Sequence, residues 1–519
     1  MPFLPPAEND TGHCRLSLPE YRKTSRSEVN NVDRQGFDKA SLIGQLARIC
    51  GEDIITDKPR LAVYETDGLT AKKQLPWVVV LPSTIDQVRA IARLCNEFSV
   101  PLVARGAGTG LSGGATPHAE GVLLSLAKFN RILSVDEQNL IATVEPGVTN
   151  LAISEHVKNL GLYYAPDPSS QLACSIGGNV AENSGGVHCL KYGLTVHNVR
   201  KLKVVSPQGE LYELGSEALD SAGYDLLALM HGSEGMLGIV VEVTVKLLPM
   251  PRAVCVVMAG FNSVQQAATA VSDIIAAGLL PAGLEMMDRP AIRAAEAFVH
   301  AGYPTDAEAL LLCELDGIEA ELEPQLDALK QVLENNAAIS VSTAHDTENR
   351  ARLWKGRKAA FPAVGRLAPD YYCMDGTIPR RQLANVLSGI NSLSKEFSLA
   401  VANVFHAGDG NLHPLILYDA NKPGELDRAE RFGGRILELC IEAGGTITGE
   451  HGVGIEKIDQ MCVQFSSAEL SLFHGVKLAF DERKILNPGK AIPTLHRCAE
   501  FGAMHVHRGQ EKFPELDRF

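Results

Sequence analysis

The sequence predicts an α+β protein with more than one domain, and three observations support this expectation. The chain has 519 residues, which is more than a single domain usually holds. Its first half contains short apolar strands joined by glycine-rich loops. After Pro249–Pro251 the pattern changes to alternating strands and helices, which is typical of an antiparallel α+β layer.

The composition excludes several classes of function. The net charge of −14 argues against binding to nucleic acid or to an anionic membrane surface. No apolar run approaches the ~20 residues that a membrane-spanning helix needs, and the first residues lack the pattern of a signal peptide. None of the 11 cysteines stands in C-x-x-C spacing, so no iron–sulfur cluster is predicted. We therefore expect a cytoplasmic protein.

The first half of the chain is predicted to form short strands with a few helices. A polar N-terminal extension, 1–50, contains one amphipathic helix at 39–49. A second helix is expected at 85–98, where Ser83 or Thr84 can cap it by accepting from a free amide of its first turn. Strands are expected at 77–81, 100–103, 121–126, 141–144, 199–206 and 238–248.

The second half alternates strands with amphipathic helices. Strands are expected at 254–261, 309–315, 400–405 and 414–417, and helices at 264–277, 318–335, 383–397, 428–443 and 470–480. A turn at 487–490 follows the last helix.

Glycines are densest in Ala104–Thr116, directly after the expected strand at 100–103. Glycine permits positive φ and close backbone approach, so successive amides can turn toward one anion, such as a pyrophosphate. Gly108, Gly110 and Gly113 match G-x-G-x-x-G, but a Rossmann site needs a helix here, and the next segment is a strand. The segment therefore predicts a strand–loop–strand cradle for a dinucleotide, with a glycine-rich surface turn as the alternative.

Two further glycine-rich stretches follow in the first half, at 166–186 and 232–238. In the stretch at 166–186, small residues and little charge would let the backbone pack against a flat ligand. The alternative is a tight internal turn. The short distance from the first glycine-rich loop favours the ligand.

The segment from His406 to His413 carries the sharpest chemical signal. An expected strand runs into Ala-Gly-Asp-Gly-Asn, which is a turn composition, and a second strand begins at Pro414. Such a hairpin can bring the two histidines together across its mouth. They would then be metal ligands, or they would hydrogen-bond to a polar turn.

Another glycine-rich loop, 444–454, favours the interpretation of these histidines as metal ligands. Its Glu450 can complete a set of two histidines and one carboxylate, which suits zinc or ferrous iron. His451 would remain free as a general base, or it would be a loop histidine without a role. Arg352 and Arg357 lie in a basic run. The run is either a solvated helix face, or one of its arginines binds a substrate carboxylate.

Together these segments resemble one family. The motifs are Ala-Arg-Gly-Ala-Gly-Thr-Gly-Leu-Ser-Gly-Gly-Ala, Pro-Asp-Pro-Ser-Ser-Gln, Gly-Ser-Glu-Gly-Met-Leu-Gly, His-Ala-Gly-Asp-Gly-Asn-Leu-His-Pro, Gly-Glu-His-Gly and Asn-Pro-Gly-Lys. From about Ile54 onward, the chain is similar to flavin-dependent 2-hydroxyacid dehydrogenases of the vanillyl-alcohol oxidase type. The resemblance implies a two-lobed FAD-binding domain at 51–250 and an α+β, ferredoxin-like cap with the substrate and metal site at 251–480. Residues 481–519 would return to the FAD lobe and end in a tail.

The resemblance also implies roles for individual residues. It places a divalent metal, zinc, on His406, His413 and Glu450, the catalytic base at His451, and the substrate-carboxylate arginine at Arg357. FAD is expected to be bound non-covalently, because the loop at 105–116 has no histidine or cysteine to attach it. The implied FAD-binding residues are Arg105, Gly106, Ala107, Gly108, Thr109, Gly110, Leu111, Pro166, Asp167, Ser170, Ile176, Gly177, Gly178, Asn179, Glu234, Gly238, Ile239 and Asn487.

The implied reaction is oxidation of a small 2-hydroxyacid, glycolate to glyoxylate or D-lactate, by hydride transfer to the flavin. Some relatives have a lysine shortly before the aspartate equivalent to Asp375, whereas this chain has Cys373 and Met374 there, which favours a small substrate over a diacid. Two alternatives stay open. One is another D-2-hydroxyacid dehydrogenase, and the other is a non-catalytic flavin relay, which would not need the metal and base residues together.

The electrons must leave this chain, because it has neither a cysteine cluster nor a membrane span. The resemblance implies a complex with a second flavin-type subunit and an iron–sulfur subunit, with membrane contact only through these partners. The tail at 496–519 is a candidate docking segment. Its alternative is an ordered wrap on the chain's own surface.

Overall fold

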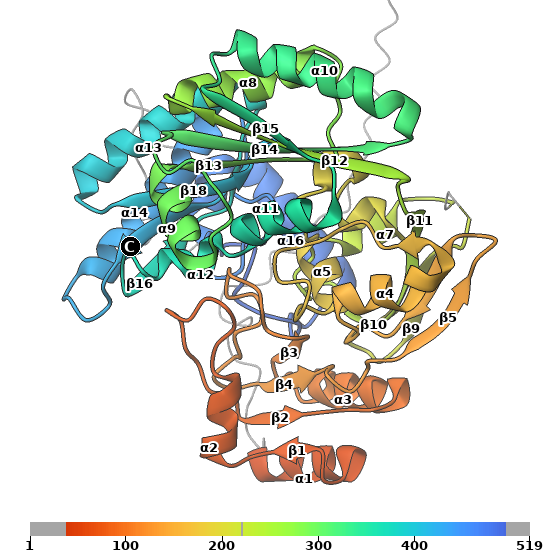
Figure 1. The fold of residues 1–519 in the computed structure, drawn as a ribbon. Helices are drawn as coiled ribbons and strands as arrows, with labels where there is room; N and C mark the ends of the chain where they lie inside the picture. The colour runs from red at the N-terminus through yellow and green to blue at the C-terminus, as the bar shows by residue number, and fades with distance from the viewer. Residues whose placement is uncertain (1–37, 219–221, 495–519) are drawn as a thin grey trace, which may run out of the picture.

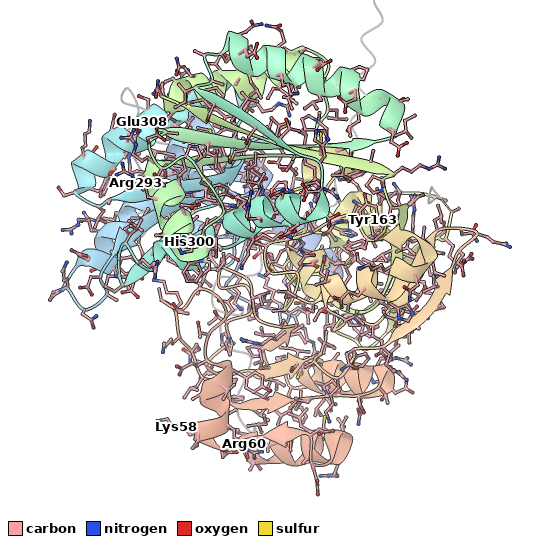
Figure 2. The ribbon with its side chains drawn as sticks, viewed as in Figure 1. Lys58, Arg60, Tyr163, Arg293, His300 and Glu308 are labelled. Atoms are coloured by element: carbon pink, nitrogen blue, oxygen red, sulfur yellow. The ribbon has the colours of Figure 1, made fainter. Side chains whose placement is uncertain are left out.

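The computed structural model describes residues 38–218 and 222–494 (Figure 1). Most of the N-terminal extension and the candidate docking tail at 496–519 lie outside the described residues. Two lobes are stacked in Figure 1, with the red-to-yellow N-terminal lobe below the green-to-blue cap. Charged side chains such as Lys58 and Arg60 of the lower lobe and Arg293 of the cap lie on the outside (Figure 2).

The first part of the lower lobe is a small sheet covered by helices. Its strands run in the order β1-β2-β4-β3, and β2 and β3 are parallel to β4. Thr84 caps helix α3 in a reciprocal capping box with Gln87, as the sequence allows. The elements are α1 Lys39–Cys50, β1 Ile54–Ile55, α2 Lys58–Leu61, β2 Val78–Val80, α3 Ile85–Glu97, β3 Leu102–Arg105 and β4 Val122–Ser125.

The second part of the lower lobe is an antiparallel sheet in the order β5-β6-β10-β8-β9. Its inward face packs on Ile153 of α4 and Val180 of α5, which are fully buried. The elements are β5 Ile132–Asp136, β6 Ile141–Val144, α4 Asn150–Val157, β7 Leu162–Tyr163, α5 Ile176–Glu182, α6 Cys189–Tyr192, β8 Val199–Val205, β9 Leu211–Gly215, α7 Leu226–Met230, β10 Ile239–Lys246 and β11 Leu248–Pro249.

The cap is built on one large antiparallel sheet with helices on both faces. The main strand order is β15-β12-β14-β13-β18-β19-β17, and β20 pairs with β18 and β16. The strands are β12 Ala253–Phe261, β13 Gly283–Asp288, β14 Ala309–Gly317, β15 Ser340–Ala344, β16 Asp370–Cys373, β17 Gly376–Thr377, β18 Val401–His406, β19 Asn411–Leu412 and β20 Pro414–Tyr418.

The helices of the cap bury the two faces of this sheet in separate cores. One face packs on α8 Val264–Ala276, α10 Glu319–Asn335, α13 Leu383–Phe397 and α14 Glu425–Glu442. The other face packs on α9 Arg289–Val299, α11 Thr347–Lys358 and α12 Ala360–Val364, which lie below the sheet in Figure 1. Helices α15 Ile458–Gln464 and α16 Ser467–Phe480 follow, after which Asn487 donates its amide N–H to Leu102 O in the lower lobe.

The α+β class expected from the sequence is confirmed, and two local expectations need correction. Ile176–Asn179 was expected as part of a glycine-rich loop or turn, but it begins helix α5, which Ser175 caps. Strand β13 was not predicted at all. Its six residues are all buried, and Glu285 and Asp288 interrupt its apolar run, so it shows neither alternation nor a continuous apolar pattern.

Candidate active site

A cavity of about 390 Å³ lies between the two lobes. The glycine-rich loop at 105–111 and the first half of α5 form its wall in the lower lobe. The cap contributes three side chains of the expected metal and base group, His413, Glu450 and His451. The topology thus brings the glycine-rich loop of the lower lobe and the Gly-Glu-His-Gly motif of the cap to one cavity.

The glycine-rich loop leaves no room for side chains at several positions. A Cβ at Gly106 would lie 2.1 Å from Ser175 Oγ, and one at Gly108, where φ is +73°, would lie 2.2 Å from Arg105 Nη2. Arg105 in turn donates to Thr66 O at 2.7 Å. The loop backbone therefore packs directly against the start of α5 and is exposed to the cavity, as a cradle for a dinucleotide requires.

Most of the expected FAD-binding residues line this cavity, and four do not. Ile176 is fully buried in the core of the lower lobe. Asp167 lines a neighbouring cavity with His188. Pro166 is also absent from the wall, and Asn487 is buried, where its side chain donates to Gly114 O at 2.9 Å and Glu234 O at 2.7 Å. Those on the wall are Arg105, Gly106, Ala107, Gly108, Thr109, Gly110, Leu111, Ser170, Gly177, Gly178, Asn179, Glu234, Gly238 and Ile239.

The histidine hairpin has the expected form. His406 ends strand β18 and pairs with Asn411 of β19, and His413 stands between β19 and β20. This geometry brings the two imidazole rings to 5.1 Å between their centroids. Both side chains are buried.

Glu450 completes the set that the sequence predicts. Its Oε1 lies 3.4 Å from His406 Nε2 and 3.3 Å from His413 Nε2, while its Oε2 accepts from Gly185 N at 3.0 Å. Among the described residues, His413 Nε2 makes no hydrogen bond and has only the carboxylates of Glu450 and Asp375 within ion-pair distance. One ligand atom from each of the three residues lies within 4.8 Å of the others, so this donor set fits a divalent metal.

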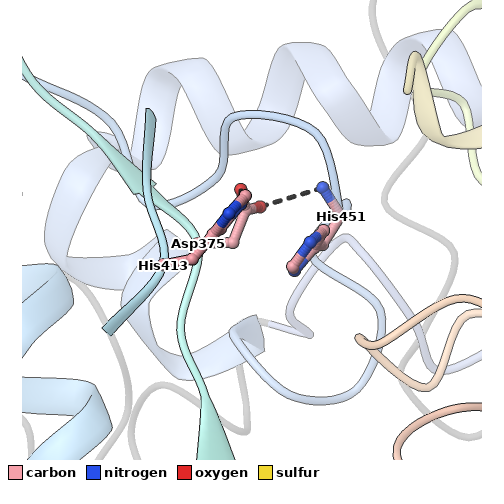
Figure 3. A group of neighbouring side chains, drawn as sticks. All are labelled: Asp375, His413 and His451. Carbon is pink, nitrogen blue, oxygen red and sulfur yellow. Dashed lines mark hydrogen bonds and ion pairs between the residues drawn. The ribbon is translucent and has the colours of Figure 1, made fainter. Parts of the chain in front are cut away.

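A second group of possible ligands shares His413. Asp375, His413 and His451 also lie within 4.8 Å of one another, and the two rings stack at 4.9 Å (Figure 3). However, the Asp375 carboxylate already accepts from Lys457 Nζ at 2.9 Å and Asn411 Nδ2 at 2.7 Å. It also accepts from Thr448 Oγ1 and from the backbone amides of Gly449, Glu450 and His451. Because these donors together occupy its lone pairs, we favour His406, His413 and Glu450 as the metal ligands.

His451 lies beside the three possible ligands His406, His413 and Glu450, with its ring stacked on that of His413. Its ring lines the cavity, and its Nδ1 is buried without a hydrogen-bond partner in the described part of the chain. Burial lowers the pKa of His451 to about 4. The unliganded ring is therefore neutral and can accept a proton.

Glu285 is a residue of the site that the sequence analysis missed. Its Oε1 lies 2.7 Å from His406 Nδ1, and its Oε2 accepts from Arg357 Nε at 2.7 Å. Burial raises its pKa, but Arg357 and His406 hold it below the ordinary value. A charged carboxylate at Nδ1 keeps the proton there and leaves His406 Nε2 free for a metal.

Arg357 lies behind the site in this structure. It is buried on α11, forms an ion pair with Glu285 at 2.6 Å, and is absent from the cavity wall. The basic run that contains it is therefore not a uniformly solvated helix face, because Arg357 and Leu353 turn inward. Lys358, Phe361 and Tyr371 line the cavity without having been predicted.

Replacing Glu285 by glutamine should weaken metal binding about 10- to 100-fold, as is usual when a residue that orients a metal ligand is lost. Glutamine can no longer hold the charge opposite Arg357 or fix the proton on His406 Nδ1. Competition of the purified variant with a chromophoric zinc chelator would measure the change. The exposed Glu323 of helix α10, changed to glutamine, is the control. An unchanged zinc affinity in Glu285→Gln would contradict this role.

The fold and the cavity between the lobes are those of an FAD-linked oxidoreductase. Residues 76–215 match a family model described as an FAD binding domain, and residues 250–491 match one described as the C-terminal domain of FAD linked oxidases. The chain is 60% identical over 499 residues to the glycolate oxidase subunit GlcD of Escherichia coli K12, covering 96% of this chain and 99% of that one. It therefore belongs to the GlcD family of FAD-linked oxidases, which confirms the resemblance stated from its motifs.

More distant comparisons agree. Identity is 41% to GlcD of Bacillus subtilis, covering 86% of this chain and 95% of that one, and 33% to a D-lactate dehydrogenase of Anaerostipes hadrus, covering 90% and 99%. Among solved structures, p-cresol methylhydroxylase with substrate bound matches with a TM-score of 0.74 at 16% identity, covering 89% of this chain and 99% of that one. The 4-ethylphenol oxidase of Gulosibacter chungangensis gives 0.73 at 18%, with the same coverage. These structures show the vanillyl-alcohol oxidase type of fold.

The described residues include no helix that is both long and apolar enough to cross a membrane.

Proposed function

We propose that this chain oxidises glycolate to glyoxylate, and D-lactate as a second substrate, with FAD in the cavity between the lobes. The observation that carries the proposal is the convergence of His413, Glu450 and His451 on the cavity that the glycine-rich loop lines. The names of the relatives, glycolate oxidase subunit and D-lactate dehydrogenase, support this choice of substrate.

In this proposal each residue has a defined role. His451 accepts the hydroxyl proton, and a positioned base of this kind contributes about 10²- to 10⁴-fold to the rate. Arg357 is the residue proposed for the substrate carboxylate, but Glu285 engages its Nε and Nη2 and it lies behind the cavity wall, so it would reach the carboxylate only if its side chain rearranged. Bound FAD supplies the acceptor for the hydride that leaves Cα, and a divalent metal such as zinc on His406, His413 and Glu450 supplies a Lewis acid at the hydroxyl.

The uncharged residues before Asp375, which lie in the cores of the cap and not on the cavity wall, also favour a small substrate. Cys373 and Met374, at the positions where some relatives have a lysine, are both buried and carry no charge to bind a second carboxylate. A diacid would therefore lose an ion pair in this site.

Anaerobic mixing of the purified holoprotein with candidate acids tests the proposed function. Glycolate and D-lactate should bleach the oxidised flavin spectrum, and a 2-hydroxy diacid should do so far more slowly. Bleaching by the diacid alone would identify a different 2-hydroxyacid dehydrogenase. No bleaching by any 2-hydroxyacid would favour a flavin relay.

The attachment of FAD can be checked without substrate. The lower-lobe residues on the cavity wall include no histidine, and the one cysteine among them, Cys174, is buried beside Asn179. The two histidines of the wall, His413 and His451, belong to the proposed metal and base group. We therefore expect acid precipitation to release yellow flavin into the supernatant. Colour that stays in the pellet after washing would contradict non-covalent binding.

For the route of the electrons we propose a complex, because the relatives in this family are named subunits. The partners would be a second flavin-type subunit and an iron–sulfur subunit, through which the assembly contacts the membrane. Deleting 496–519 should abolish co-purification with these partners and leave glycolate-driven bleaching intact. Unchanged co-purification would exclude docking through the tail, and loss of flavin would show that the tail is structural.

A further inference from the structure

The loop at 448–452, which carries Glu450 and His451, has no regular secondary structure. Its shape must therefore be set by specific hydrogen bonds. The carboxylate of Asp375, which is fully buried, provides most of them. It accepts from Thr448 Oγ1 at 2.6 Å and from the backbone amides of Gly449 at 3.1 Å and Glu450 at 3.2 Å. It also accepts from the backbone amide of His451 at 2.9 Å, the bond that Figure 3 shows as a dashed line.

Lys457 holds the same loop from its carbonyl side. This lysine is also fully buried, and its Nζ donates to Gly452 O at 2.9 Å and to Asp375 Oδ2 at 2.9 Å. The two charges compensate each other, and each side chain is saturated by groups of the loop. Such charge-assisted bonds to several consecutive backbone groups leave the loop little conformational freedom.

Asp375 also connects this loop to the histidine hairpin. Its Oδ1 accepts from Asn411 Nδ2 at 2.7 Å, and Asn411 pairs with His406 across the hairpin. The fit at this point is tight, since a Cβ on Gly449 would lie 2.1 Å from Asn411 Nδ2. One carboxylate thus fixes the loop that supplies Glu450 relative to the hairpin that supplies His406 and His413.

We propose that Asp375, paired with Lys457, is the positioning residue that assembles the metal set and places His451 at the cavity. This proposal rests on the proposed function in one respect, the assignment of His406, His413 and Glu450 as the metal ligands. Asp375 is absent from the cavity wall and acts through these residues.

The test compares Asp375→Asn with the unaltered holoprotein. Asparagine keeps the shape but loses the anion, so the affinity for added Zn²⁺ should fall about 10- to 100-fold, the usual effect of losing a residue that supports metal ligands. Glycolate-driven flavin reduction should fall with it, and the FAD content should not change.

Two further variants separate positioning from stability. Asp375→Asn leaves Lys457 buried without its counter-charge, so the double variant Asp375→Asn/Lys457→Met should recover thermal stability without recovering Zn²⁺ affinity. Asp481 is the matched control. It is another fully buried aspartate that pairs with a lysine, Lys477, at 2.6 Å and accepts from the amide of Leu486. Asp481→Asn should lose stability and keep the Zn²⁺ affinity of the unaltered chain.

The outcomes are distinct. Unchanged Zn²⁺ affinity in the double variant, or an equal loss in Asp481→Asn, would overturn the proposal and leave Asp375 a stability residue. Because Zn²⁺ binding is measured without substrate, a chain that fails to oxidise glycolate or D-lactate would overturn the proposed function and leave the result for Asp375 standing.

Discussion

His451→Ala is expected to slow reduction of the flavin by glycolate about 10²- to 10⁴-fold, the usual contribution of a positioned base. The ring lines the cavity, and its buried Nδ1 has no partner among the described residues, so alanine removes a proton acceptor and breaks no hydrogen bond of that atom. Stopped-flow absorbance under anaerobic conditions measures the rate. FAD and metal contents should not change, because the backbone amide of His451 still donates to Asp375.

The matched control is His345→Ala, which removes an exposed histidine of the cap. Its flavin reduction should match that of the unaltered chain. Two results would contradict the assignment of His451. A loss smaller than about threefold would place the base elsewhere, and loss of the metal would favour Asp375, His413 and His451 as the ligand set.

Removing a metal ligand should lower turnover by a similar factor, because the bound metal is lost. His406→Ala and Glu450→Ala should each lose bound divalent metal and most turnover while FAD remains. Each variant removes one of three protein ligands of the metal. The metal affinity should therefore fall by more than about 100-fold, which is the largest usual effect of losing a residue that only supports a ligand. The glycine-rich loop that lines the flavin cavity lies in the other lobe and is untouched.

Elemental analysis after dialysis, together with the flavin absorbance, measures both contents in one sample. Glu442→Ala, at an exposed position of α14, is the control and should retain metal and turnover. Unchanged metal in both ligand variants would overturn the assignment of His406, His413 and Glu450. Loss of FAD together with the metal would show that the two sites depend on each other.

The sequence by itself predicted those features of the site whose residues lie close together in the chain. Glycine spacing predicted the strand–loop–strand cradle, because the backbone conformation it needs is a local property. The turn composition between His406 and His413 predicted their proximity, since a hairpin closes over a few residues. Glu450 was predicted as the third metal ligand because it lies in a glycine-rich loop.

Only the tertiary structure decided which groups support these residues. Glu285 stands 121 positions before His406 and 72 before Arg357, and Asp375 stands 76 positions before His451. These pairs form because strand order in the cap places distant segments side by side, and no local pattern encodes strand order. A buried carboxylate also looks the same in sequence whether it pairs with an arginine, a lysine or a row of amides. Its partners, and therefore its role, follow from packing alone.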